Sequence, residues 1–283
     1  MIGRIVILSD THLGRPDGAA LSAAALRPLW HGANHLVLNG DVAEVHHPIY
    51  RGQAAREVMQ LLELAERDGV QVTMLSGNHD PYLSDVRHLR LASGRVFITH
   101  GDVLHPAIAP WSPAADKIRT VNKLAMAKLE PGQRDCLENR LAVSQHAASA
   151  EWAYYNTHKP RPAWVELLQR PWLIPQILMY WKKIPHLAAA FAAEHVPDAR
   201  FILLGHTHRQ GIWNLAHRVI INTGCYGFPG KPWAVVLDQG ELSVRPVLCD
   251  GTSYRLSMRP VATFPITDQP QAPGIPAGSP VTA

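Results

Sequence analysis

Cysteine is scarce, and its distribution suggests neither a disulfide framework nor a zinc ribbon. The chain of 283 residues has three cysteines, Cys136, Cys225 and Cys249, which lie far apart and form no Cys-x-x-Cys pair. Small secreted domains that depend on disulfides carry many more cysteines at close spacings. We therefore expect a reducing compartment and a cytoplasmic protein.

Long apolar runs are absent as well. A helix needs about 20 consecutive apolar residues to span a bilayer, and the best candidate, Trp172 to Trp181, is short and interrupted by Pro175. The stretch from Met1 to Leu8 is too short for the apolar core of a secretion signal. We expect no membrane-spanning helix, and at most contact with a membrane surface.

Charge of one sign is not concentrated in any segment. The chain has 27 Lys and Arg against 23 Asp and Glu, for a net charge of +4, and no dense basic block. A nuclease would show a long basic track with interleaved aromatic residues. The slight basic excess suits a small anionic substrate better than a nucleic acid.

Strand and helix patterns alternate in the first third of the chain. Short apolar runs at residues 4–8, 35–38 and 70–75 predict buried strands. Residues 19–29 and 54–67 predict helices, the second with an apolar stripe along one face. This order of strand, helix and strand predicts parallel pairing.

The rest of the chain predicts more strands and a helical insertion. Further strands are predicted at residues 89–91, 96–99, 201–204, 219–222, 234–237 and 242–247. Those at the end follow one another without helices, which implies an antiparallel portion. Between about 105 and 199 the chain is rich in Ala, Leu, Trp and Pro with helical periodicity, which predicts an insertion. The fold class is therefore α/β, with two packed mixed sheets flanked by helices.

The same patterns divide the chain into a core domain and a tail. We expect one domain over residues 1–263, with the insertion at about 105–199 inside it. From residue 264 to 283 the chain consists largely of Pro, Gly, Ala and Thr and has little to bury. Such a composition predicts a disordered tail.

Clusters of polar residues directly follow five of the predicted strands. Ligands bind at the carboxyl ends of strands in open α/β sheets, so we expect these clusters to converge on one rim. Within Asp-x-His and His-x-His, residues i and i+2 point to the same side while the chain stays extended. The clusters are Ser9-Asp10-Thr11-His12, Asn39-Gly40-Asp41, Ser76-Gly77-Asn78-His79-Asp80, Thr99-His100-Gly101-Asp102 and Gly205-His206-Thr207-His208.

The chemistry of these side chains predicts a metal site. Carboxylates, a carboxamide and imidazoles are too hard for a thiolate-type site and too rich in nitrogen for a calcium site. They fit Mn²⁺, Fe or Zn²⁺, as a pair of ions. Any one of these histidines could be an ordinary core residue, but five clusters in this order leave little room for that interpretation.

These motifs resemble those of the calcineurin-like metallophosphoesterase superfamily, whose pattern is D-x-H, G-D, G-N-H-[DE], H and G-H-x-H. The resemblance covers residues 1–101 and 201 to about 247, but not the insertion. It implies a four-layer double β-sandwich flanked by helices. It also implies a phosphoesterase with two divalent ions, Mn²⁺ foremost, that hydrolyses a phosphomonoester, phosphodiester or pyrophosphate with metal-activated water.

The resemblance also implies a role for each motif residue. Asp80 would lie near His79 as an orienting partner, and His79 would donate a proton to the leaving oxygen rather than bind metal. The metal ligands would form two sets that share one bridging carboxylate. Asp10, His12 and His208 would hold the first ion, Asn78, His100 and His206 the second, and Asp41 would bridge both.

The insertion contains five of the eight tryptophans and several basic residues, which allow two interpretations. The tryptophans could pack the insertion onto the core, which we favour for most of them. Alternatively, tryptophan beside basic residues is typical of helices that lie on anionic lipid, and the insertion would then contact a membrane. The residues are Trp111, Trp152, Trp164, Trp172 and Trp181, with Lys159, Arg161, Arg170, Lys182 and Lys183.

One subfamily, the UDP-2,3-diacylglucosamine hydrolases, is similar in having a helical insertion between H-G-D and G-H-T-H. The run from Gly40 to Glu44 is also similar to its G-D-x-x-E motif. His79 departs from the subfamily, which typically carries Arg there. This departure favours a more generic phosphodiester or phosphomonoester chemistry over the pyrophosphate substrate of that subfamily. A phosphorylated small molecule and a lipid-linked precursor both stay open as substrates.

Two other functions compete with these. A nuclease or cyclic-nucleotide phosphodiesterase would use the same chemistry, but the basic residues here are scattered. A catalytically weak scaffold of the same fold, as in the retromer subunit, would typically lack the proton-donating histidine. His79 and the complete ligand set favour an enzyme. The sequence does not indicate an oligomeric state.

Overall fold

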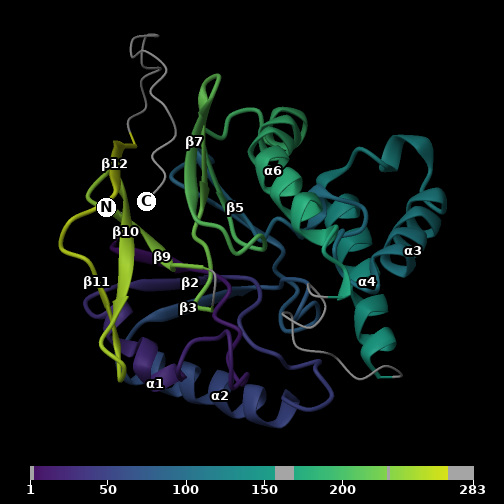
Figure 1. The fold of residues 1–283 in the computed structure, drawn as a ribbon. Coiled ribbons are helices and arrows are strands. Elements are labelled where there is room, and N and C mark those ends of the chain that lie inside the picture. The colour runs from purple at the N-terminus through teal and green to yellow at the C-terminus, as the bar shows by residue number, and fades with distance from the viewer. Residues whose placement is uncertain (1–2, 157–168, 228–229, 267–283) are drawn as a thin grey trace.

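The computed structural model describes residues 3–156, 169–227 and 230–266, in which two β-sheets pack face to face (Figure 1). The first sheet has the strand order β11-β10-β9-β1-β2-β3, with β12 beside β10. Its β1, β2 and β3 run parallel, and β9 joins β1 in the antiparallel direction. The strands are β1 (Ile5–Leu8), β2 (His35–Asn39), β3 (Gln71–Leu75), β9 (Trp233–Asp238), β10 (Glu241–Cys249), β11 (Tyr254–Leu256) and β12 (Ala262–Pro265).

The second sheet has five strands in the order β4-β5-β6-β8-β7. Its central strands β5, β6 and β8 run parallel, while β4 and β7 pair with them in the antiparallel direction. Both sheets are therefore mixed, as the sequence predicts. The strands are β4 (His88–Leu91), β5 (Val96–Thr99), β6 (Phe201–Leu204), β7 (Gly211–Leu215) and β8 (Arg218–Asn222).

Helices cover the outer faces of both sheets and complete a four-layer arrangement. Side chains alternate along β1, so that Ile5 and Ile7 pack between the sheets while Val6 and Leu8 pack toward α1 and α2. The outer face of the second sheet packs against α6. The predicted fold class is confirmed. The covering helices are α1 (Ala23–Leu26), η1 (Arg27–Trp30), α2 (Arg51–Arg67) and α6 (Leu173–His195).

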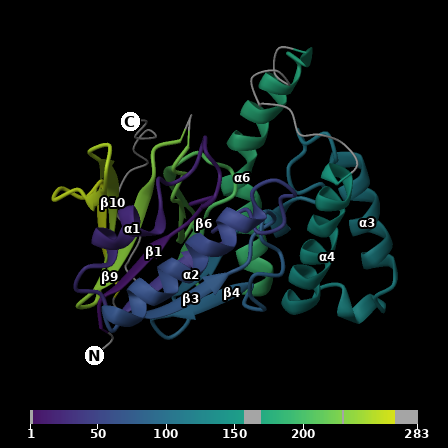
Figure 2. The same ribbon diagram turned by 90° about the horizontal axis from the view of Figure 1, so that it is seen from below.

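All regular elements that the structure describes in the insertion between β5 and β6 are helical. A short turn, η2 (Asp102–Leu104), leads from β5 into α3 (Ala115–Ala127), η3 (Pro131–Gln133) and α4 (Leu137–Tyr155). Figure 2 shows α3 and α4 side by side, beyond α6 and away from the first sheet. Residues 157–168, which include Trp164, Lys159 and Arg161, lie outside the described residues. No helix in the described ranges has the length and apolar content needed to cross a membrane.

Two boundaries differ from the sequence-based expectation. The helix expected over residues 19–29 begins only at Ala23, because the Ser22 hydroxyl caps it by accepting a hydrogen bond from the backbone amide of Ala25. Phe264, the first residue of the expected tail, instead pairs with Leu242 in β12, which extends to Pro265. Residues 267–283 of that tail lie outside the described residues.

A buried ion pair joins the insertion to the core beside the His100 motif. Asp102 Oδ2 accepts from Arg87 Nη2 at 2.6 Å and from the Ser144 hydroxyl of α4 at 2.9 Å. Arg87 Nη1 donates to the backbone carbonyl of Ser76 at 2.9 Å. Both charged side chains are almost fully buried, so each depends on the other for charge compensation.

Removal of the carboxylate should therefore destabilise the fold. Asp102→Ala leaves the Arg87 guanidinium buried without its partner, which costs about 3–5 kcal/mol. The free energy of unfolding from urea titration, with chelator present to remove metal effects, measures the loss. Asp116→Ala is the matched control, because it breaks an exposed pair with Arg119 and should leave the urea midpoint unchanged. Equal midpoints for the two variants would contradict this account.

Candidate metal centre

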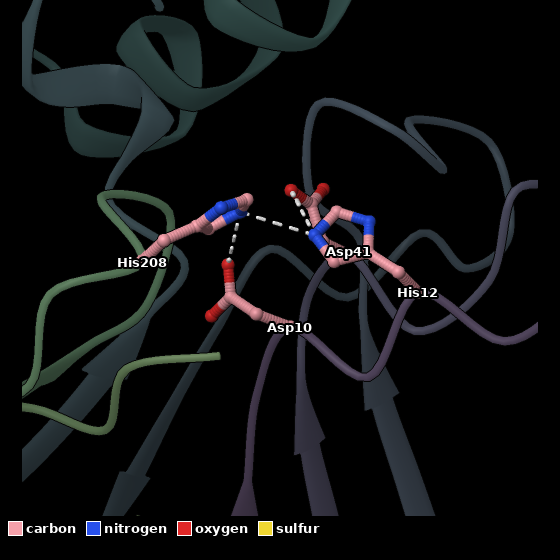
Figure 3. A group of neighbouring side chains, drawn as sticks. All are labelled: Asp10, His12, Asp41 and His208. Carbon is pink, nitrogen blue, oxygen red and sulfur yellow. Dashed lines mark hydrogen bonds and ion pairs between the residues drawn. The ribbon is translucent and has the colours of Figure 1, made fainter. Parts of the chain in front are cut away.

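Loops that follow β1, β2, β5 and β6 bring the predicted ligands together at one end of the two sheets. Among the described residues, three groups of side chains offer ligand atoms that lie within 4.8 Å of one another, and two of the three consist entirely of predicted ligands. The third joins His12 to Glu44 and His79. Figure 3 shows the first group, with His12 and His208 facing each other above Asp10. The carboxylate of Asp41 belongs to both groups of predicted ligands. The groups are Asp10, His12, Asp41 and His208, and Asp41, His100 and His206.

Asn78, the one predicted ligand with a carboxamide, lies in the second group. Its Oδ1 atom is 2.8 Å from His206 Nδ1. The other ring nitrogen of His206, Nε2, lies 3.2 Å from the backbone carbonyl of Ile108. A carbonyl only accepts, so it favours the tautomer with the proton on Nε2. Nδ1 and Asn78 Oδ1 then both present lone pairs to one point, as two ligands of a cation would.

Two other ring nitrogens are oriented in the same way. His100 Nδ1 donates to the backbone carbonyl of Asn39 at 2.9 Å, which turns Nε2 toward Asp41 Oδ2 at 3.2 Å. His12 Nδ1 donates to Glu44 Oε1 at 3.0 Å. Each contact leaves the second nitrogen pointing into the site, which is the usual arrangement of metal-binding histidines.

Several buried polar atoms of the site have no hydrogen-bond partner in the described structure. Asp10 Oδ2 is fully enclosed without one, and the enclosed His100 Nε2 forms an ion pair with Asp41 Oδ2 but no aligned hydrogen bond. Buried polar atoms are normally hydrogen-bonded, because desolvation without compensation is costly. A cation that accepts these lone pairs would satisfy both atoms. The residues present therefore fit divalent metal ions with nitrogen and oxygen ligands.

The backbone of the ligand loops is strained. Asp10, His12, Asp41, His206 and His208 all have positive φ angles, between 47° and 67°. This conformation is uncommon for residues other than glycine and costs about 1–3 kcal/mol at each position. Five of the ten such residues in the described chain are predicted ligands, which marks the loops as functional.

The positive φ angles contradict the sequence-based explanation of why the ligand side chains converge. The chain at Asp10 and at His206 is not extended, so the i and i+2 side chains do not share a side by strand alternation. The left-handed backbone conformation orients these side chains toward the site instead. Close approach then requires glycine, since a Cβ at Gly205 would lie 2.2 Å from Asp10 Oδ2 and one at Gly77 would lie 2.2 Å from Asp41 Oδ1.

Burial and crowded charges shift the pKa values of the cluster. Burial raises the pKa of Asp10 to about 6, with a further contribution from the Asp41 charge. Burial also lowers the pKa of His206 to about 4, which keeps its ring neutral. Burial would lower the pKa of His100 too, but the charges of Asp41 and Asp10 raise it to about 10. Such a cluster holds protons in positions that divalent cations would take over.

His79 lies beside the ligands and carries a proton. Its backbone amide donates to Asp41 Oδ1 at 2.8 Å, and its Nδ1 lies 3.2 Å from Glu44 Oε2. Burial opposes the charged ring, but the charges of Glu44 and Asp41 raise its pKa to about 10. The side chain is 24% exposed, so a protonated imidazole is accessible at the edge of the site.

No hydrogen bond joins the side chains of Asp80 and His79 among the described residues, and the prediction that Asp80 orients His79 stays a prediction. Both carboxylate oxygens of Asp80 accept hydrogen bonds from backbone amides, those of Gly77 at 2.6 Å, Asp41 at 3.1 Å and Val42 at 2.6 Å. Adjacency in the sequence suggested the pairing with His79. The buried amides of two tight loops need acceptors, however, and the Asp80 carboxylate supplies them.

Sequence reasoning missed three residues that support the site. The sequence gives Glu44 only as part of the Gly40–Glu44 motif, with no role of its own. In the structure its carboxylate accepts hydrogen bonds from both His12 and His79. Ile108 contributes a backbone carbonyl, which no side-chain pattern reveals. Trp152 of α4 reaches the site from the insertion, where spacing alone gave no signal.

Comparison with known proteins gives one family match. The family model described as calcineurin-like phosphoesterase matches residues 3–210. No curated protein sequence matches the chain.

Solved structures similar to the chain share little sequence with it. They include Yfce, a phosphoesterase from E. coli, with 18% identity and a TM-score of 0.42, covering 93% of this chain and 100% of that one. A conserved uncharacterized protein from Streptococcus pneumoniae TIGR4, a predicted phosphoesterase, has 16% identity and a TM-score of 0.37, with coverages of 91% and 98%. Vps29 from Entamoeba histolytica, complexed with Zn²⁺, has 10% identity and a TM-score of 0.41, with coverages of 93% and 99%. Structural similarity at these sequence identities and TM-scores does not show a shared function.

The family model covers most of the chain and includes the loops that carry all the predicted ligands. Those loops converge in the structure as the family motifs require. The chain belongs to the calcineurin-like phosphoesterase family.

Proposed function

We propose that this chain is a dinuclear metal-dependent phosphoesterase that hydrolyses a phosphomonoester, a phosphodiester or a pyrophosphate. The observation that carries the proposal is the pair of ligand groups sharing Asp41, beside His79, whose Nδ1 lies 3.2 Å from Glu44 Oε2. Asp10, His12 and His208 would hold one ion, and Asn78, His100 and His206 the other. Mn²⁺ suits this mixed set best, with Fe and Zn²⁺ as alternatives. When bound, the ions would supply an activated water and neutralise phosphate charge.

His79 supplies the general acid. The contact with Glu44 Oε2 fixes the proton on Nδ1 and turns Nε2 outward, so the proton on Nε2 is the one available to a leaving oxygen. Glu44 itself is fully buried, and burial opposes its ionisation, but His79 and His12 hold its pKa well below the usual value. Its charge therefore stabilises the protonated ring before transfer, and its hydrogen bond keeps the ring aligned afterwards.

Asp41 should be indispensable for metal retention. Asp41→Asn keeps the size of the side chain but removes the charge that both ligand groups share, so activity and both ions should be lost together. Hydrolysis of p-nitrophenyl and bis-p-nitrophenyl phosphate and elemental analysis of dialysed protein measure the two effects. Asp238→Asn, at the exposed end of β9, is the matched control. Full metal content in Asp41→Asn would disprove the shared-ligand arrangement.

His79 should matter for turnover and not for metal. His79→Ala should retain wild-type metal content and lose about 10²–10⁴-fold in kcat, with the larger loss on phenyl esters, whose poor leaving groups need protonation. His217→Ala, at the exposed β7–β8 turn, is the control. Unchanged turnover of a phenyl ester by His79→Ala would rule out the general-acid role.

A metal-bound scaffold of the same fold is the competing function. It would bind ions without hydrolysing either nitrophenyl ester in the presence of Mn²⁺, Fe²⁺ or Zn²⁺. The proton-carrying His79 beside the ligands favours the enzyme, because a scaffold has no use for a general acid.

A lipid-linked substrate is the second candidate, and an exposed apolar stretch of α6 favours it. Trp172, Ile174, Leu178 and Met179 are 62%, 47%, 52% and 54% exposed. Figure 2 shows this end of α6 projecting beyond the sheets. The exposed Lys182 and Lys183 follow on the same helix. Apolar side chains beside lysines are typical of helices that lie on anionic lipid.

Peripheral membrane contact through α6 should depend on anionic lipid. Wild-type protein should sediment with vesicles that contain phosphatidylglycerol and not with vesicles of phosphatidylcholine alone. The double change Ile174→Glu and Leu178→Glu should abolish sedimentation, because it places charge in the apolar face. Met258→Glu, at an exposed position outside the insertion, should sediment like wild type. Absence of wild-type binding would refute the membrane contact.

A further inference from the structure

The insertion contacts the loop of the general acid through α4. The indole Nε1 of Trp152 donates to the backbone carbonyl of Asn78 at 3.2 Å. Its ring lies edge-on to the imidazole of His79, with centroids 5.7 Å apart. About two turns earlier on the same helix, the Gln145 amide donates to the carbonyl of Pro81. The segment from Asn78 to Pro81 is thus held from one side by α4.

A second tryptophan makes the equivalent contact with the His-x-His loop. Trp181 of α6 donates from Nε1 to the backbone carbonyl of Thr207 at 2.9 Å. Thr207 separates His206 and His208, which both have strained backbone. The guanidinium of Arg209 lies over the Trp181 ring, 5.5 Å from its centroid. The loop and α6 are therefore joined on both sides of His208.

The insertion also reaches one ligand directly. The carbonyl of Ile108 lies 3.2 Å from His206 Nε2 and accepts from the Tyr180 hydroxyl at 3.4 Å. Ile108 is fully buried and has a φ of 58°. Positive φ in a β-branched residue is a true outlier, so the surrounding structure must hold this carbonyl in place.

These contacts share a feature that simple packing would not require. A buried indole needs only some acceptor for its N–H, yet each of these two indoles uses a carbonyl within one residue of a predicted ligand. The ligand loops adopt conformations that isolated chains avoid, and such strain persists only where neighbouring contacts over-determine the backbone. The Trp181 hydrogen bond adds such a contact between His206 and His208. The Trp152 hydrogen bond holds the Asn78 segment, whose residues are not among those with positive φ.

We propose that the helical insertion is a positioning component of the metal centre, in which Trp152 aligns the Asn78–His79 segment and Trp181 aligns the His206–His208 loop. This inference rests on the proposed function and assigns the insertion a part in it. Neither tryptophan touches the reacting atoms. Each acts through the carbonyl that its indole binds.

Replacing Trp152 or Trp181 by phenylalanine tests the hydrogen bond separately from the packing, because phenylalanine keeps an aromatic ring and lacks the N–H donor. Trp152→Phe should misalign His79, so the loss in kcat should be several-fold larger for a phenyl ester than for the matching p-nitrophenyl ester. Trp181→Phe should weaken Mn²⁺ binding about 10-fold or more, as loss of partners behind metal ligands does, with the leaving-group dependence unchanged. Calorimetric titration of the metal-free protein with Mn²⁺ measures the affinity independently of activity.

Trp213→Phe is the matched control, because Trp213 is a half-buried tryptophan of β7 that the proposed function does not use. It should match wild type in both assays. If Trp152→Phe melts far below wild type, Gln145→Leu replaces it, since that change releases the same segment at Pro81.

Equal losses on both esters for Trp152→Phe, together with wild-type Mn²⁺ affinity for Trp181→Phe, would overturn the inference. If wild-type protein hydrolyses no ester, the proposed function fails separately. The Mn²⁺ affinity of Trp181→Phe relative to Trp213→Phe then decides the inference alone, with equal affinities overturning it.

Discussion

The carboxylate of Asp41 is the point at which both ligand groups meet, and the geometry of the site depends on it. Oδ2 lies 3.2 Å from His100 Nε2 and 3.9 Å from His12 Nε2, while Oδ1 accepts from the backbone amide of His79. Although burial raises its pKa, the neighbouring histidines hold it well below the usual range. One buried charge thus connects both groups of candidate ligands and His79.

The fold supplies this convergence by placing two sheets face to face with their ligand loops at one end. Asp10 and Asp41 follow strands of the first sheet, and His100 and His206 follow strands of the second. The insertion leaves the core after His100 and returns before His206, so its helices necessarily lie beside the ligands. Buried contacts such as Arg87 with Asp102 fix that arrangement, and the strained loops are held between rigid layers.

Much of this could be predicted from the sequence, because strand periodicity and the order of polar clusters are local signals. Every predicted ligand, from Asp10 to His208, lies in the converged site. The contacts that support the ligands were not predictable in the same way. Glu44 rather than Asp80 pairs with His79, since competition among buried amides for acceptors is decided by tertiary structure. The Ile108 carbonyl and the indoles of Trp152 and Trp181 act through backbone positions that no side-chain pattern encodes.

The most direct test of the central claim is a crystal structure of the wild-type protein soaked with Mn²⁺, with anomalous scattering used to locate the ions. The account predicts two anomalous peaks flanking the Asp41 carboxylate, about 3.5–4 Å apart as in other two-metal sites. A single peak, or two peaks of which only one lies within bonding distance of Asp41, would contradict the shared-carboxylate site.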